Sequence, residues 1–386
     1  MKVAVTILAF CVTSLLALGL VMLYSSSMTM VDRRTHAEIG AHMLQMQVVW
    51  CILGFIACAV MAALDYQMLK RFAWPLFIGS LLLAVLVFAP KIGINLNGAH
   101  RWIRVKSVTC QPSEFVKIAL IIVLAWYGDR FQRKMNTITR GILIPGIIIA
   151  AALGLIFIEP DRGTTILLAA VSGTMLMLAG VRWLHVIPPV LAAGAALAYS
   201  LTHDSMRSTR IMAWLHPDEH ASGVALQAEQ AKIAIGSGGL TGLGLGDGRQ
   251  KLGFLPEIHS DFIFANIGEE LGLVATALVI LAFMLIAVCG LFIALRSRDR
   301  FGCLLAVGVA SLISYQAIIN IGVVTSLLPN KGLALPFISA GGSSLLAMLI
   351  GVGILFSVAR QAAPPKISAT DIVSHDNSNP FAAKAT

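Results

Sequence analysis

The sequence predicts an all-α, polytopic integral membrane protein, and three observations support this class. Of the 386 residues, 58% are hydrophobic and only 12% are charged, whereas soluble domains carry about 25% charged residues. The mean hydropathy of +0.85 means that one water-facing core cannot bury most of the apolar surface. The apolar residues also form runs of the length that spans a bilayer, about 20 residues in a helix. A soluble two-domain enzyme, which the length alone would allow, is therefore excluded.

Ten apolar runs predict about ten transmembrane helices. The fourth run is short and holds Lys117, and the eighth is longer than a bilayer needs, so it is expected to tilt or to project beyond the membrane. The first run is too long for the apolar region of a signal peptide, so we expect it to remain as an anchor. A window of about 19 residues places the runs at 3–24, 46–64, 72–89, 114–128, 141–158, 163–181, 183–201, 262–295, 303–326 and 343–360.

Lysine and arginine in alternate short loops predict the orientation. Cytoplasmic loops of membrane proteins are rich in these residues, so both termini are expected in the cytoplasm and the chain in the cytoplasmic (inner) membrane. The long loops 90–113 and 202–261 would then lie outside, where their cations suggest a negatively charged ligand. Residues 1–360 form the expected membrane domain and 361–386 a mobile cytoplasmic tail. The cations that set the orientation are Lys70, Arg71, Arg130, Arg133, Lys134, Arg140, Arg182, Arg296, Arg298 and Arg300.

Nucleic acid is not an expected partner, although the isoelectric point is near 9.5. The basic residues are scattered over short loops instead of being clustered on one face, which is typical of membrane topology. The six cysteines form no CxxC pair or Cys/His metal spacing, so neither a disulfide framework nor a zinc site is predicted.

The loop before the eighth span contains a predicted interface helix and a glycine-rich run. Residues 224–235 are apolar at helical spacing, which is typical of a helix lying on a membrane surface. The run GSGGLTGLGLGDG at 236–248 lacks the spacing of a phosphate-binding loop and follows no strand. Its glycines are expected to let the backbone approach other backbone or a ligand closely.

Acidic residues gather where the eighth span begins, in LPEIHSDFIFANIGEELG from Leu255. Glu269 and Glu270 lie inside the apolar run, where a charge costs about 2.5–3.5 kcal/mol even on the lenient insertion scale. They are expected to face protein or water, and bridging of helices is as plausible as a function. Because adjacent helix positions point in different directions, only one of the two is expected to face a given site.

Asp261 lies at the predicted membrane boundary. Partial burial there would raise the pKa of its carboxyl group and make it a usable proton acceptor. The alternative is an N-cap for a helix that starts at Phe262. Local sequence alone favours the N-cap.

Further polar segments lie on the predicted outer side, each with a structural alternative. GAHRWIRVK contains Arg101, QPSEFVK suits an ordinary helix start, and the charges of EPDRG could simply pair with each other. LPNKGLALPFISAGGSS at 328–344 holds two prolines and no continuous helix. Because irregular backbone near membrane depth is tolerated in protein or around a wet cavity, this segment is the best local indication of a binding cavity.

Six ordered segments resemble the signatures of the SEDS family (FtsW, RodA, SpoVE). The resemblance extends from about Tyr24 to Arg360, and Lys331 in LPNKG looks more like the division-type pattern than the elongation-type one. The chain departs from the family pattern at Arg162, Asn330, Ala340 and residues 225–227. The segments are GAHRWI, QPSE, EPDRGTT, AIGSGGLTGLGLG, QKLGFLPEIHSDFIFANIGEELG and NIGVVTSLLPNKGLALPFISAGGSS.

The resemblance implies a ten-helix peptidoglycan glycosyltransferase, acting in cell division, that polymerises lipid II on the outer face of the membrane. Its implied partners are a class B penicillin-binding protein and other divisome proteins. The family's essential loop aspartate maps onto Asp261, which would act as general base on the 4-hydroxyl of the acceptor sugar. Cations, with a divalent ion (Mg²⁺ or Mn²⁺) as a further candidate, would stabilise the pyrophosphate leaving group, although no motif shows a metal site and no cofactor is assigned.

The resemblance and the polar segments together give two sets of candidate residues. Those expected to bind substrate are Arg101, Glu114, Lys117, Arg210, His259, Ser260, Lys331, Ser339 and Ser343. The acids expected to be structural or to line a cavity are Glu159, Asp161, Glu257, Glu269 and Glu270.

Two other functions stay open. A lipid II flippase could use Glu269, Glu270 and the broken 328–344 segment as its path, because intramembrane acids and interrupted helices mark transport routes. The concentration of polar residues on one face speaks against it. A non-catalytic scaffold for a penicillin-binding protein is the second, and it predicts that the outer-face polar groups are dispensable.

Overall fold

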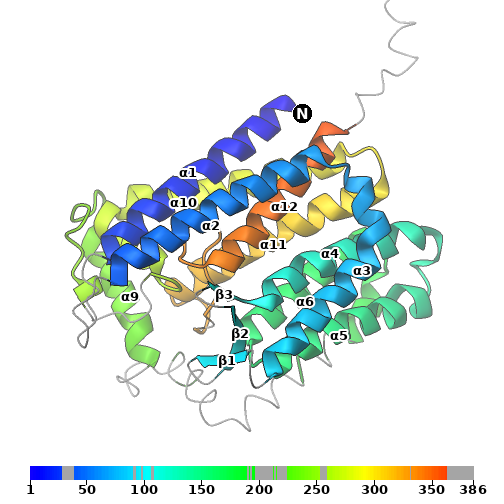
Figure 1. Ribbon diagram of the computed structural model, residues 1–386, viewed down its shortest axis with the longest axis horizontal. Helices are drawn as coiled ribbons and strands as arrows, with labels where there is room; N and C mark the ends of the chain where they lie inside the picture. Colours follow the sequence, from blue (N-terminus) through cyan, green and yellow to red (C-terminus); the bar gives the residue numbers. More distant parts are fainter. Residues whose placement is uncertain are drawn as a thin grey trace, which may run out of the picture.

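The computed structural model describes residues 1–27, 39–89, 93–96, 99–105, 108–188, 191, 194–195, 212, 214, 224–252, 259–330 and 332–362. The regular structure of this part of the chain is helical apart from one small sheet (Figure 1), and seven of its helices are long and apolar enough to cross a membrane. The predicted all-α, polytopic membrane class is confirmed. The count of ten spans stays a prediction, because most of the span expected at 183–201 lies outside the described residues.

Nine helices coincide with nine of the predicted spans, and a tenth, α9, coincides with the predicted interface helix. The helices are α1 (Lys2–Ser27), α2 (Ile39–Ala63), α3 (Tyr66–Val85), α4 (Pro112–Arg130), α5 (Ile144–Ile158), α6 (Arg162–Leu178), α9 (Val224–Gly238), α10 (Ile263–Leu295), α11 (Arg300–Val324) and α12 (Gly342–Arg360). Helices α2 and α3 begin six or seven residues earlier than hydropathy predicts. The reason at α3 is a cap, because the Asp65 side chain accepts a hydrogen bond from Gln67 N at 2.8 Å.

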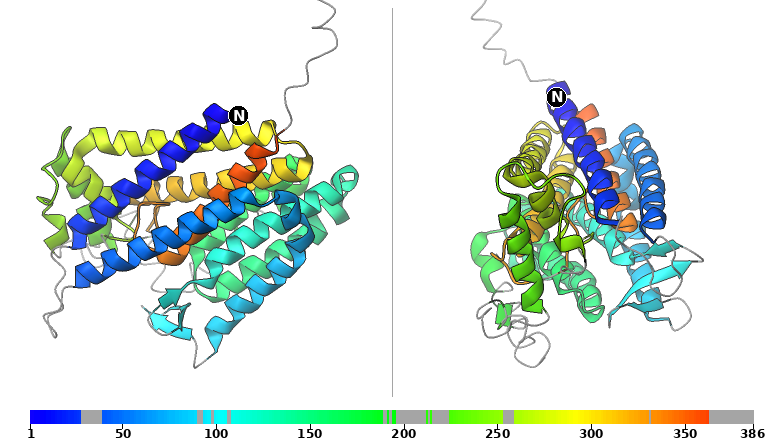
Figure 2. Two further views of the ribbon diagram at one scale, coloured as in Figure 1. Left: turned by 45° about the horizontal axis from the view of Figure 1, so that its top comes forward. Right: turned by 90° about the vertical axis from the view of Figure 1, so that its left-hand side faces the viewer.

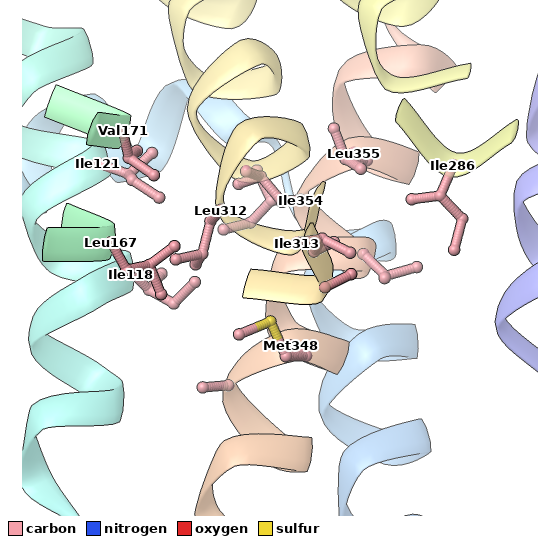
Figure 3. Close-up of a cluster of buried hydrophobic side chains, with 14 of the residues drawn as sticks. Ile118, Ile121, Leu167, Val171, Ile286, Leu312, Ile313, Met348, Ile354 and Leu355 are labelled. Carbon is pink, nitrogen blue, oxygen red and sulfur yellow. The ribbon is translucent and has the colours of Figure 1, made fainter. Parts of the chain in front are cut away.

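Helix α11 occupies the middle of the bundle. It packs against α10, α4, α6 and α12, and 67% of its most apolar stretch is buried, against 22% in α2. Figure 3 shows Leu312 and Ile313 of α11 between side chains of α4, α6, α10 and α12. Helix α11 is therefore packed on most sides by protein, whereas α2 and α3 leave many apolar side chains exposed for lipid.

The two ends of the bundle differ in charge, and we call the end that holds the cations of the short loops the arginine end. The N-terminus also lies there (Figures 1 and 2). Three interactions join neighbouring loops at this end. They are the hydrogen bonds from Arg360 Nη2 to Ala63 O (2.7 Å) and from Arg300 Nη2 to Ala179 O (2.8 Å), and the Lys70–Asp129 ion pair.

The opposite end, the acidic end, carries a three-stranded antiparallel sheet that the sequence did not predict. Its strands are β1 (Gly93–Leu96), β2 (Ala99–Val105) and β3 (Val108–Cys110), in the order β1-β2-β3. Ile94 is opposite Trp102, and Arg104 is opposite Thr109. The sheet lies beside the starts of α4 and α12 (Figure 1) and brings Arg101 of β2 to this end.

Helix α10 is interrupted at Gly272, where φ is 74° and ψ is −171°. A backbone in this region suits glycine because glycine has no Cβ. The first turns of α10, which hold Glu269 and Glu270, are thus set apart from the rest of its 33 residues.

Candidate active site

The loop that leads into α10 is held by three consecutive backbone carbonyls. We call residues 259–261 the HSD turn. Each of its carbonyls accepts a hydrogen bond from α11 or from the segment that follows α11. The bonds run from Ala340 N to His259 O (3.0 Å), from Ser339 Oγ to Ser260 O (2.6 Å) and from Asn320 Nδ2 to Asp261 O (2.9 Å). The C-terminal third of the chain therefore fixes the position of Asp261.

Asp261 does not cap α10. The helix starts at Ile263, its N-cap residue is Phe262, and no side chain caps it. The N-cap interpretation that local sequence favours is therefore wrong, because the helix begins one residue later than expected. Asp261 is half-buried, and its backbone carbonyl is held by Asn320.

Gly332 lies against the Asp261 carboxylate. Its φ is +59°, and a Cβ added to it would come 3.1 Å from Asp261 Oδ2. A side chain here would be strained and would crowd the carboxylate. The glycine thus leaves space beside the group that is expected to take up a proton.

The irregular segment 332–341 is mostly buried in protein, with Gly332 exposed at its start, and burial in protein is what irregular backbone at membrane depth requires. The Leu335 amide donates to Ser339 Oγ at 2.8 Å, so the Ser339 hydroxyl both accepts and donates within the protein. Just ahead of the segment, Asn330 Nδ2 donates to Gln227 Oε1 of α9 at 3.0 Å. These contacts connect the HSD turn, the segment and α9.

Glu114 and Lys117 form an ion pair inside the protein. Lys117 Nζ lies 2.8 Å from Glu114 Oε1, and the lysine is 0% exposed. The same ammonium donates to Gln316 Oε1 at 3.2 Å, and Gln316 Nε2 donates to Ala334 O at 2.9 Å. The pair predicted to bind substrate therefore joins α4, through α11, to the irregular segment.

The EPDRG turn holds one satisfied acid and one buried acid without a donor. Asp161 caps α6, accepting from Thr164 N (3.0 Å) and Thr164 Oγ1 (2.9 Å). Glu159 is 0% exposed, and neither carboxyl oxygen has a hydrogen-bond partner among the described residues. Burial, with a smaller contribution from Asp161, raises the pKa of Glu159 to about 8, although Arg101 opposes the shift.

The remaining candidates divide between bound side chains and residues outside the described part of the chain. Arg101 Nε donates to the backbone carbonyl of Glu159 at 3.1 Å, and Ser343 Oγ accepts from Gln111 N at 3.2 Å. Arg210, Glu257 and Lys331 lie outside the described residues. Within the described ranges no group of three His, Cys, Asp or Glu side chains is placed to hold a metal ion.

Glu270 anchors the loop that follows α9, residues 239–252, which we call the glycine-rich loop. Its carboxylate accepts from Ser25 Oγ of α1 at 2.6 and 2.7 Å, from Lys251 Nζ at 2.9 Å and from Gly246 N at 3.1 Å. The acid and the lysine are both buried. Three donor groups, a hydroxyl, an ammonium and a backbone amide, thus offset the desolvation of this charge.

Glu269 binds the same loop, contrary to the expectation that adjacent acids face different sites. Its Oε1 accepts from Arg249 N at 2.7 Å and from Gln250 N at 3.3 Å. Both the end of α9 and the loop pass close to α10, since a Cβ on Gly238 would lie 1.9 Å from Gly268 O and one on Gly272 would lie 2.4 Å from Gly242 N. The glycines let backbone contact backbone, so one loop can meet both side chains.

Comparison with known proteins identifies the family. The sequence model of the FtsW, RodA and SpoVE family, described as cell cycle proteins, matches residues 6–363. This chain belongs to that family. Among the relatives of this SEDS chain, a "Probable peptidoglycan glycosyltransferase FtsW" of Trichlorobacter lovleyi is 41% identical, covering 91% of this chain and 92% of the relative. The Bacillus subtilis "Stage V sporulation protein E" is 37% identical, covering 90% and 94%.

Solved structures of SEDS proteins share the fold. A chain from a structure described as "Structural coordination of polymerization and crosslinking by a peptidoglycan synthase complex" superposes with a TM-score of 0.76 at 25% identity, covering 92% of this chain and 97% of that one. The rod shape determining protein RodA of Thermus thermophilus gives a TM-score of 0.67 at 26% identity, with the same coverage. The chain is therefore a multi-pass membrane protein of SEDS architecture.

Sequence reasoning missed two residues that hold the site, Gln316 and Asn320. They lie one turn apart on α11, and each donates to the irregular segment. The signal that could have found them is a pair of amides at i and i+4 in an apolar span, since polar groups inside a membrane helix face protein partners.

Proposed function

We propose that this SEDS protein is a peptidoglycan glycosyltransferase that polymerises lipid II into glycan strands during cell division. The names of its FtsW relatives support the activity. The observation that carries the proposal is the half-buried Asp261, whose carboxylate lies beside Gly332 in a turn with all three carbonyls bound. A carboxylate fixed in this way is suited to proton transfer, which needs a positioned base.

The proposal includes an orientation. The arginine end, which holds the N-terminus and the end of α12, would face the cytoplasm, and the acidic end would face outward. Asp261 would then meet its substrates at the outer boundary of the membrane. The exposed apolar side chains of α2 and α3 would face lipid, in which the tails of both substrates reside.

In the proposed reaction, Asp261 takes the proton from the 4-hydroxyl of the acceptor sugar while that oxygen attacks the anomeric carbon of the donor. The bond from this carbon to the pyrophosphate oxygen breaks, and undecaprenyl pyrophosphate leaves with the electron pair. Displacement with inversion needs only one protein base when the leaving group is already good. Arg101, Arg210 and Lys331 would stabilise the charge that develops on the pyrophosphate.

The proposed partners are a class B penicillin-binding protein and other divisome proteins. The similar synthase complex is described as coordinating polymerization with crosslinking, which supports a crosslinking partner. No nucleic acid is involved.

A polymerisation assay tests the function. Protein purified in detergent, alone and with its penicillin-binding partner, is given labelled lipid II and scored for glycan chains. Wild type is expected to form polymer and Asp261→Asn none, with an unchanged melting temperature. Polymer from Asp261→Asn would refute the base assignment. If wild type forms no polymer and lipid II flipping in vesicles survives the substitution, the flippase is favoured. If Asp261→Asn forms no polymer but cells that carry it divide like wild type, the scaffold is favoured.

A further inference from the structure

Asn320 uses one nitrogen to hold two parts of the site together. Its Nδ2 donates to Asp261 O at 2.9 Å and to Leu333 O at 2.6 Å. An amide nitrogen has two hydrogens, so both are used. The side chain is 2% exposed, which excludes water from these bonds. The carbonyls that it joins are 72 residues apart in the chain (333 − 261).

Only one orientation of this amide is compatible with its surroundings. With Oδ1 and Nδ2 exchanged, an oxygen would face two carbonyl oxygens, and all three are acceptors. The observed orientation is therefore set by the hydrogen bonds. An aspartate of the same shape could not replace the amide, because an ionised carboxylate only accepts.

The helix that carries Asn320 is suited to hold a fixed distance. Helix α11 is packed on several sides by other helices, and Gln316, one turn earlier on the same face, donates to Ala334 O at 2.9 Å. The amides thus hold adjacent carbonyls of the irregular segment. Both amides hydrogen-bond to the irregular segment, but in the described part of the chain only Asn320 also hydrogen-bonds to the HSD turn.

We propose that Asn320 is a positioning residue that sets the place of the Asp261 carboxylate relative to Gly332. This inference rests on the proposed function, because it takes Asp261 as the base. Gly332 directly precedes Leu333, whose carbonyl Asn320 binds, and it lies against Asp261 Oδ2. Loss of the amide would remove the bonds that connect Asp261 itself to Leu333, so that the carboxylate could shift relative to Gly332. A displacement of about 1 Å at a reacting group costs about a hundredfold in rate.

The test compares Asn320→Leu, which removes both donors at similar volume, with Asn320→Ser, which keeps one. Detergent-purified variants are assayed on labelled lipid II for kcat and KM. We expect kcat to fall about 10- to 100-fold in Asn320→Leu and less in Asn320→Ser. KM should stay within about twofold of wild type, because positioning of a base acts on the transition state and not on substrate binding. Ser314→Ala is the matched control, since its hydroxyl bonds only within α11, to Ala310 O at 2.8 Å.

Three outcomes would overturn the inference. They are a wild-type kcat in folded Asn320→Leu, a rise in KM that accounts for the whole loss, and a loss of the thermal unfolding transition in both variants, which would indicate a purely structural residue. If only Asn320→Leu fails to fold, the kcat and KM of Asn320→Ser decide. Asp261→Asn in the same assay separates the two proposals. An active Asp261→Asn refutes the proposed function, whereas an inactive one beside a fully active Asn320→Leu refutes only the positioning role.

Discussion

The start of α10 carries two acidic regions that differ in what is bound, the HSD turn and the pair Glu269–Glu270. In the HSD turn, the protein binds the backbone carbonyls, and the Asp261 side chain stays half-buried beside a glycine. In the pair, the protein binds the carboxylates themselves with backbone amides, a hydroxyl and an ammonium. The bound carboxylates of the pair fix a loop, whereas Asp261 is placed by the hydrogen bond to its backbone carbonyl and lies beside Gly332.

Acidic residues that lie within ten positions of one another therefore serve two purposes, one in the candidate site and one in fixing a loop. Burial of a charge is expensive unless several hydrogen bonds compensate it. The two carboxylates of the pair are engaged in holding the glycine-rich loop. The four predictions that follow test this comparison, from the largest expected effect to the smallest.

Glu270→Ala should lower the free energy of unfolding by about 3 kcal/mol, because it leaves Lys251 buried without its carboxylate. Its effect on kcat per folded molecule should be far smaller than that of Asp261→Asn. Chemical denaturation in detergent and the lipid II assay measure the two quantities. A stable but inactive Glu270→Ala would place the pair in catalysis and break the comparison.

Glu159→Gln should stabilise the protein increasingly as the pH rises. The folded-state pKa of Glu159 is raised from 4.5 to about 8, so the folded state binds more protons than the unfolded one between these values. Wild-type stability therefore decreases from about pH 4.5 to 8 and then levels off. The variant lacks this loss, and its advantage should be about 2 kcal/mol at pH 6 and larger at pH 8. Melting temperatures at pH 5, 6.5 and 8 measure it, and a pH-independent difference would contradict the prediction.

Gly332→Ala should reduce kcat about tenfold, because the new Cβ would crowd Asp261 Oδ2 and displace the carboxylate. Gly239→Ala is the matched control. Gly239 has a similar φ of +54° but no atom within 4 Å of a Cβ, so it should share the backbone strain without the loss of rate. Equal kcat values for the two variants would show that the space beside Asp261 is not required.

Lys70→Ala at the arginine end should cost less than about 0.5 kcal/mol. Its pair with Asp129 is a partly exposed ion pair, with side-chain exposures of 36% and 19%, so water replaces the lost partner. The same denaturation experiment measures it beside Glu270→Ala. A loss as large as that of Glu270→Ala would mean that burial does not decide the strength of these pairs.

The spans were predictable because lipid selects for apolar residues along the whole length of a helix. Hydropathy did not predict the early start of α2, because His42, Gln45 and Gln47 interrupt the apolar residues of its first turns. These turns lie at the acidic end, where Gln47 Nε2 donates to Ser339 O at 3.4 Å. It also missed the sheet, because strands of three to seven residues in a polar loop give no apolar run. The glycine-rich loop was correctly expected to let backbone approach backbone, but its partner was not identifiable.

The candidate site was predictable only in part. The resemblance pointed to Asp261 and to the LPNKG segment, while the N-cap that local sequence favoured is wrong. The contacts of Lys117 and Ser339 with Gln316 and Ser260 could not be read from the sequence. Each joins residues about 80 to 200 positions apart, and no local pattern encodes such a pairing.

Composition determined that this protein lies in a lipid bilayer and is helical, because both depend on transfer free energies summed along each segment. The order of motifs determined its family. Tertiary structure decided which acids fix a loop and which one lies in the candidate site. It also brought Asn320 into hydrogen-bond contact with the turn that contains Asp261. The physical reason is that a hydrogen bond depends on distances of tenths of an ångström and on direction. Such distances arise only when α10, α11 and the segment after α11 pack together.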